Sequence, residues 1–154
     1  MLLINHVLSG ALIGTLARRP VPAFVAGVAS HFVLDAVPHW GDWGSPRRFL
    51  RVAVPDGLAS LAVMGALTAA SPPGCRAAVL AGMTGAALPD ADKPGRLWFG
   101  RSPFPAAVDR FHARIQDEAY HRAPAELAAA ALLAATALAA IRGTRRGRYS
   151  GPGS

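Results

Sequence analysis

A short apolar segment of the chain contains several side chains that could bind a metal ion. His31 and Asp35 are four positions apart, so a helix places both on one face, about one turn from each other. Pro38 disfavours helical backbone at the residue before it, which predicts that the helix ends there. His39 and Asp42 follow the proline and can turn back toward the same point. Imidazole and carboxylate groups in this pattern suit a divalent cation; a buried structural histidine is the alternative for His31.

Further imidazole and carboxylate groups recur at the ends of the apolar segments, where an isolated ionisable group is costly. We therefore predict that helix ends far apart in the sequence converge on one metal-binding pocket. Its expected ligands are His6, His31, Asp35, His39, Asp56 and Asp90, with Asp92 and His121 either bound to the ion or beside its ligands.

One of these positions, Asp56, and one residue left out of the set, His112, have simpler interpretations. Asp56 follows Pro55 at an expected helix start, where a carboxylate can equally serve as a helix cap. Asp109 and His112 are spaced to share a helix face, and most such pairs are solvated. His112 is therefore a weak candidate and is not included in the predicted ligand set.

A divalent ion in such a pocket would support hydrolysis. With one coordination position open, it lowers the pKa of bound water toward neutrality. The candidate ligands are numerous enough for one or two ions, and two ions would clamp the attacking and leaving oxygens of a phosphoester. Asp35 or Asp92, if not fully engaged by metal, could act as the general base. Arg96 or Arg122 could hold an anionic headgroup.

The segments that must position these groups are predicted to be helices. No period-two alternation indicates a strand, and prolines or glycine-containing turns separate the apolar runs. We expect an all-α, compact bundle of five to six helices, embedded in a membrane. The predicted helices span 2–17, 21–37, 56–70, 76–88, 105–120 and 124–141. Residues 1–141 would form a helical metal-binding membrane domain, and residues 142–154 a basic disordered tail.

The composition favours a membrane protein. Of the 154 residues 52% are hydrophobic and only 16% charged, against about 25% charged in a soluble domain. The formal net charge is +7, and arginines cluster between Arg142 and Arg148. A basic segment that follows an apolar helix is typical of the cytoplasmic side of a membrane, where it faces anionic lipid. We expect an integral protein of the cell membrane with its tail in the cytoplasm, and no specific nucleic-acid partner.

Four short motifs resemble those of known enzymes. The segment Gly27-Val-Ala-Ser-His31-Phe-Val-Leu-Asp35-Ala-Val-Pro-His39 resembles the Gly-x-x-Ser-His-x-x-x-Asp-x-x-x-His signature of the zinc-dependent phospholipase C superfamily. The segment Gly85-Ala-Ala-Leu-Pro89-Asp90-Ala-Asp92 is similar to the Gly-x-x-x-Pro-Asp-x-Asp element of those enzymes and of the bacterial membrane-bound metal-dependent hydrolases. Asn5-His6 resembles their opening Thr-His, and His121-Arg122-Ala-Pro the start of the hydrolases' His-Arg-Gly-x-Thr-His-Ser motif.

This resemblance implies an all-helical membrane protein that binds zinc or a similar divalent ion and hydrolyses a phosphoester or another ester. A site at a helix end beside the bilayer favours a lipid or lipid-linked substrate over other esters. Two alternatives remain: a non-catalytic membrane protein with a structural or transport-related metal site, and a small basic protein whose tail recruits anionic partners. A closed four-ligand site would favour the structural role, and an open position facing a cleft the enzyme.

Overall fold

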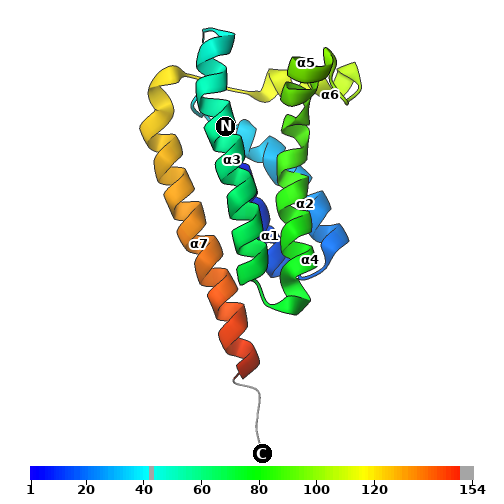
Figure 1. Ribbon diagram of the computed structural model, residues 1–154, viewed down its shortest axis with the longest axis vertical. Coiled ribbons are helices and arrows are strands. Elements are labelled where there is room, and N and C mark those ends of the chain that lie inside the picture. Colours follow the sequence, from blue (N-terminus) through cyan, green and yellow to red (C-terminus); the bar gives the residue numbers. More distant parts are fainter. Residues whose placement is uncertain (42–43, 150–154) are drawn as a thin grey trace, which may run out of the picture.

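The computed structural model describes residues 1–41 and 44–149, and this part of the chain is all-helical and contains no strand. The elements are, in chain order, α1 (Leu3–Ala17), α2 (Pro20–Asp35), α3 (Pro46–Ala70), α4 (Pro73–Ala87), the 3-10 turn η1 (Leu88–Ala91), α5 (Asp92–Phe99), α6 (Ala106–Ile115), the 3-10 turn η2 (Tyr120–Arg122) and α7 (Ala123–Tyr149). Helices α3, α4 and α7 run along the long axis, while α5 and α6 lie at one end of the bundle (Figure 1). The predicted all-α bundle is confirmed.

Glycines allow α1, α2 and α4 to pack closely at the centre of the bundle. Helix α1 contacts α2, α3, α4 and α7. A Cβ added at Gly10 or Gly14 would collide with the backbone of α4, at Gly82 and Ala78 respectively, and one added at Gly27 would collide with Gly82. Small residues at such contacts let helix backbones approach each other. The start of α1 and the ends of α2 and α4 are thereby held at the same end of the molecule.

Helix α3 begins at Pro46, so the start predicted at residue 56 is wrong. Ser45 accepts a hydrogen bond from the backbone N–H of Arg48 at 3.3 Å and caps the helix. Pro46 lies in the first turn, where no backbone donor is required. Pro55, taken in the sequence as the start signal, lies inside the helix. The cap and proline at 45–46 are the stronger start signal.

The segment after α4 contains two short helices where one was predicted. Helix α5 has Asp92 in its first turn and ends at Gly100, whose φ of 69° is left-handed. Helix α6 ends at Ile115, before the predicted residue 120, because the chain then pairs with the loop after α2. The N–H of His39 donates to the carbonyl of Asp117, and the N–H of Ala119 donates to the carbonyl of His39, both at 3.0 Å.

Helix α7 continues to Tyr149, whereas a disordered tail was predicted from residue 142. Arginine is a good helix former, and cations in the last turns interact favourably with the helix dipole. The basic segment up to residue 149 is therefore part of the helix, and residues 150–154 lie outside the described residues.

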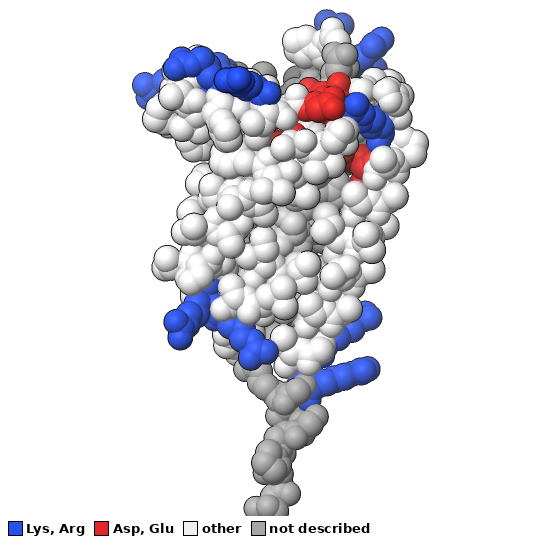
Figure 2. Space-filling view, turned by 180° about the vertical axis from the view of Figure 1, so that it is seen from behind, with Lys and Arg blue, Asp and Glu red and all other residues white. Residues whose placement is uncertain are grey.

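The bundle exposes apolar side chains along its length. The segments Pro46–Ala70 and Tyr120–Arg146 are long and apolar enough to cross a membrane. Leu61 of α3 and Leu132 of α7 are 66% and 69% exposed. Figure 2 shows one face, on which an uncharged zone separates Lys and Arg at both ends and Asp and Glu lie near one end only. Length and composition thus permit two membrane spans.

Candidate metal centre

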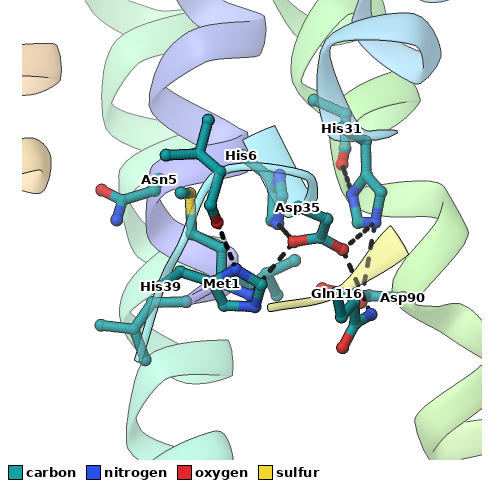
Figure 3. A network of polar contacts seen from close by, with 12 residues as sticks. Met1, Asn5, His6, His31, Asp35, His39, Asp90 and Gln116 are labelled. Carbon is teal, nitrogen blue, oxygen red and sulfur yellow. Dashed lines mark hydrogen bonds and ion pairs between the residues drawn. The ribbon is translucent and has the colours of Figure 1, made fainter. Parts of the chain in front are cut away.

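Four side chains that could hold a metal ion converge at the end of the bundle where α5 and α6 lie. One atom from each of His31, Asp35, Asp90 and His112 lies within 4.8 Å of the other three. These residues come from α2, η1 and α6, so three separate segments form the cluster. Figure 3 shows His31, Asp35 and Asp90 pointing toward one another.

Helix α2 supplies two of these side chains. His31 Nε2 lies 3.2 Å from Asp35 Oδ2, as the four-residue spacing predicts, and both residues are buried. His31 Nδ1 lies 2.7 Å from the carbonyl oxygen of Ala86. Because a carbonyl only accepts, Nδ1 must carry the proton and donate it. The lone pair of His31 Nε2 is therefore directed into the cluster, an arrangement that commonly orients histidine ligands of metals.

His112 completes the cluster from α6, although the sequence prediction left it out. Its Nε2 lies 2.8 Å from Asp35 Oδ2 and 3.0 Å from His31 Nε2. The expected surface pair with Asp109 does not form; Asp109 instead binds Arg96 at 2.6 Å. His112 faces inward and is buried. The only sequence signal was its helical position, which does not distinguish the inner face of α6 from the outer one.

Asp90 reaches the cluster from the turn after α4. Its Oδ1 lies 3.9 Å from both His31 Nε2 and His112 Nε2. The same oxygen accepts a 2.6 Å hydrogen bond from Lys93 Nζ. Burial raises the pKa of Asp90, but the ammonium of Lys93 and the nearby imidazoles outweigh it and hold this pKa below its usual range. Asp90 is therefore ionised at neutral pH, as a metal ligand must be.

The spacing of the four groups fits a divalent ion. Zinc bonds of about 2.0–2.2 Å place neighbouring ligand atoms of a tetrahedral site about 3.3–3.6 Å apart. The imidazole-to-carboxylate distances here are 2.8, 3.2, 3.9 and 3.9 Å. Two imidazole nitrogens and two carboxylate oxygens form a donor set typical of zinc and similar divalent ions. The buried cluster could therefore hold one metal ion.

His6 lies directly beside this cluster. Its Nε2 is 3.1 Å from Asp35 Oδ1, the oxygen that faces away from His31 and His112. Its ring stacks on that of His31, with centroids 4.0 Å apart. His6 is fully buried, and its Nδ1 has no hydrogen-bond partner in the described part of the chain. The predicted convergence of α1 with α2 and the turn after α4 is thus observed.

Three other predicted residues lie outside the four-residue cluster. His39 is buried, with Nδ1 2.8 Å from the carbonyl oxygen of Val37 and Nε2 3.6 Å from Glu118 Oε1. Asp92 contacts Lys93 Nζ at 3.5 Å. His121 is exposed on η2. The loop pairing directs His39 away from the cluster, and the turn at η2 does the same for His121. Asp42 lies outside the described residues.

Asp56 caps a helix, but not its own. Its two oxygens accept the backbone N–H groups of Leu3 and Ile4 at 2.6 and 3.2 Å. Glu126 accepts the N–H of Leu2 at 2.7 Å. The first turn of α1 contains no acidic side chain, so carboxylates from α3 and α7 satisfy its free donors. The cap expected at the start of its own helix is therefore wrong, and Asp56 instead caps the start of α1.

An apolar cavity of about 860 Å³ lies beside the cluster, between the first half of α3 and α5. Most of its wall is hydrophobic, including Leu58 and Leu61 of α3 and Trp98 of α5. Asp90, Lys93 and Gln116 form polar parts of the wall, and Gln116 donates to Asp35 Oδ2 at 3.3 Å. The cavity therefore joins an apolar surface to the edge of the candidate metal centre.

Comparison with family models, with curated proteins and with solved structures found no match to this chain.

Proposed function

We propose that this protein is a membrane-bound, metal-dependent hydrolase that acts on a phosphoester or other ester of a lipid or lipid-linked compound. The proposal rests on one observation: a large apolar cavity lies directly beside the buried cluster of His and Asp side chains, and Asp90 belongs to both. A pocket of this kind accommodates a hydrocarbon chain, while the cluster meets the polar end of the same molecule. The motif resemblance to metal-dependent hydrolases is consistent with this chemistry.

The four clustered residues have the role of metal ligands in this proposal. His31, Asp35, Asp90 and His112 would hold one divalent ion, for which zinc is our choice because two imidazoles and two carboxylates suit it. Such an ion polarises an ester and lowers the pKa of a bound water toward neutrality. A second ion remains part of the prediction, with His6 the nearest additional imidazole.

Other side chains would position the substrate and move protons. Both oxygens of Asp35 have imidazole neighbours, so we assign it to the ion and not to proton transfer. Asp92 remains the predicted general base. Lys93 and Gln116 line the cavity next to the cluster, where an ammonium and an amide can hold the anionic or carbonyl oxygens of an ester.

Insertion in a membrane is part of the same proposal. Two helices have sufficient length and hydropathy, and both expose leucines that water would solvate poorly. A lipid substrate could then enter the cavity from the bilayer, since exposed Leu58 and Leu61 belong to its wall. The basic end of α7 would lie in the cytoplasm.

The non-catalytic alternative has one observation in its favour. Four protein ligands could close the coordination shell, and His31, Asp35 and His112 are almost fully buried. Asp90 is the more accessible ligand and belongs to the cavity wall, so we favour a site that substrate can reach.

The test is zinc-dependent hydrolysis by the purified full chain in detergent. Substrates would be p-nitrophenyl phosphate, p-nitrophenyl caprylate and a phospholipid in mixed micelles. We expect activity that chelation removes and zinc restores, that His31→Ala abolishes and that His121→Ala retains. A protein that binds one equivalent of zinc but hydrolyses none of the three would support the structural or transport role instead.

A further inference from the structure

The end of the molecule opposite the metal centre is basic and contains no acidic residue among the described ones. Arg18 and Arg19 lie between α1 and α2, Arg76 in the first turn of α4, and Arg142 and Arg145 near the end of α7. All five are exposed. We refer to these five residues as the arginine end. Figure 2 shows blue side chains without red ones at this end.

Every described carboxylate lies at the other end. Asp35, Asp90, Asp56 and Glu126 contact the metal cluster or the start of α1, and Asp92 contacts Lys93. Asp109 binds Arg96, and Asp117 and Glu118 lie in the segment that pairs with His39. Acidic and basic groups therefore offset each other at the metal end. The net charge of +7 is concentrated at the arginine end.

Three helix ends meet around a depression at the arginine end. A cavity of about 510 Å³ is lined by the end of α1, the start of α4 and the end of α7. Its wall includes the side chain of Arg18 and the hydroxyl-bearing residues Thr15 and Thr144. The hydroxyls of both threonines already donate to the carbonyls of Ala11 and Ile141, so the donor that the depression offers to a phosphate oxygen is the guanidinium of Arg18.

We propose that the arginine end binds the phosphate headgroups of anionic phospholipids and thereby places the metal centre at the opposite membrane face. This inference rests on the membrane insertion in our proposed function, but not on hydrolysis. Anionic lipid attracts basic groups next to membrane-spanning helices, mainly at the cytoplasmic leaflet. The metal centre would then face the extracytoplasmic side.

The surroundings favour lipid over nucleic acid as the partner. Leu16 and Val21, next to the arginines, are exposed apolar side chains that an aqueous partner would leave uncovered. Single-stranded nucleic acids are usually bound by stacking on aromatic rings. Within residues 1–41 and 44–146, the exposed aromatic side chains are at the metal end: Trp98, Phe99, Phe111 and Tyr120. Lys and Arg occur at both ends, so their count alone does not orient the protein, whereas the distribution of carboxylates distinguishes the two surfaces.

The binding test uses the full chain in dodecylmaltoside, titrated with dihexanoyl phosphatidylglycerol or dihexanoyl phosphatidylcholine. We expect at least about tenfold tighter binding of the anionic lipid, weakened by salt and by on the order of fivefold for each arginine removed. The variant Arg18→Gln/Arg19→Gln/Arg142→Gln/Arg145→Gln should bind both lipids equally. The single variants Arg18→Gln and Arg142→Gln provide the same readout if the quadruple variant loses helical structure.

The matched control removes arginines from the metal end. Arg47→Gln/Arg48→Gln/Arg51→Gln should change the lipid preference less than about twofold, because carboxylates already offset the field there. Equal affinity of the wild-type chain for the two lipids would overturn the inference. So would an equal loss in the control variant, or tighter binding of a single-stranded oligonucleotide than of phosphatidylglycerol.

Orientation is tested with a membrane-impermeant maleimide on intact cells. Cys75 is buried, so the wild-type chain gives the background. Arg110→Cys, exposed on α6, should be labelled in intact cells, and Arg145→Cys only after permeabilisation. Any other pattern contradicts the proposed orientation. Release of the protein from membranes by carbonate would instead show that the proposed membrane insertion is wrong. The lipid-binding test does not depend on hydrolysis, because it measures binding whether or not the protein hydrolyses an ester.

Discussion

Asp35 connects the side chains of the candidate metal centre through its two carboxylate oxygens. Its Oδ1 lies 3.1 Å from His6 Nε2 and 3.1 Å from the Met1 amino group. Its Oδ2 lies 2.8 Å from His112 Nε2 and 3.3 Å from Gln116 Nε2. A buried carboxylate needs such partners, since an unpaired charge in this environment is costly. Removing its charge should therefore affect the whole cluster.

We predict that Asp35→Asn lowers zinc affinity by at least about 100-fold. Loss of a group that only orients a metal ligand costs up to about 100-fold in affinity, and Asp35 is assigned as a ligand itself. The amide keeps the size of the side chain but loses the charge and one acceptor. Metal content after dialysis, measured by mass spectrometry, should fall from one equivalent to near zero. His121→Ala should retain the metal, and an Asp35→Asn protein with full metal content would contradict the assignment.

The ligand set assigned from the structure includes His112 and not His39, whereas the set predicted from the sequence includes His39 and not His112. His112 lies within the cluster, whereas His39 contacts Val37 and Glu118. We expect His112→Ala to abolish the visible absorption of the cobalt-substituted protein and His39→Ala to preserve it, because only the first removes a ligand. The reverse result would restore the sequence-based ligand set.

Asp56 should contribute to stability and not to metal binding. Asp56→Asn replaces one of two acceptors at the start of α1 by a donor, which should lower the free energy of unfolding by about 1–2 kcal/mol. Denaturant unfolding in detergent measures this change, and metal content should stay at the wild-type level. Asp117→Asn, at an exposed ion pair, is the control and should have an effect below about 1 kcal/mol. A loss of metal in Asp56→Asn would identify it as a ligand.

At the scale of helices, the contact of α1 with α4 determines where the ends of both helices lie. Gly10 and Gly82 face each other so closely that neither tolerates a Cβ without movement of the opposing backbone. Asp90 follows directly after α4, and His6 lies in the first turns of α1. A shift between these helices therefore changes both the packing and the geometry of the cluster.

We predict that Gly82→Ala destabilises the protein by about 1–3 kcal/mol through overpacking and also weakens metal binding. Gly57→Ala is the matched control, since nothing lies within 4 Å of a Cβ there, and its higher helix propensity should stabilise α3 by up to about 1 kcal/mol. Thermal unfolding in detergent, with and without zinc, compares the two. Equal stability of both variants would show that the close contact is not required.

For the molecule as a whole, the uncharged surface between the two ends is the feature from which we expect a membrane environment. Exposed leucines on α3 and α7 belong to helices of sufficient length to cross a bilayer. Apart from Asp56, whose oxygens accept N–H groups of α1, the charged residues of α3 and α7 lie toward the helix ends, where headgroups and water can solvate them.

We therefore expect the full chain to remain in the membrane pellet after carbonate extraction. Leu61→Arg should reduce the inserted fraction, because an arginine near the centre of a spanning helix costs about 2.5–3.5 kcal/mol. Leu61→Ala is the control for the loss of side-chain volume. A monodisperse protein recovered from the cytosol without detergent would contradict the membrane assignment.

Features that depend on residues close together in the chain could be predicted from the sequence. Apolar runs and breaks predicted an all-α bundle, and the spacing of His31 and Asp35 predicted their contact, because hydrogen bonding within a helix places residues four apart on one face. Which other helix ends meet these two residues depends on how the helices pack against one another. His112 is 77 positions from Asp35, and its orientation depends on how α6 packs. Asp56 and His39 have suitable chemistry, yet a helix start and a paired loop engage them instead. Local spacing follows from backbone geometry, whereas contacts between helices depend on close packing at glycines and on loop pairing, which the pattern of a single segment does not contain.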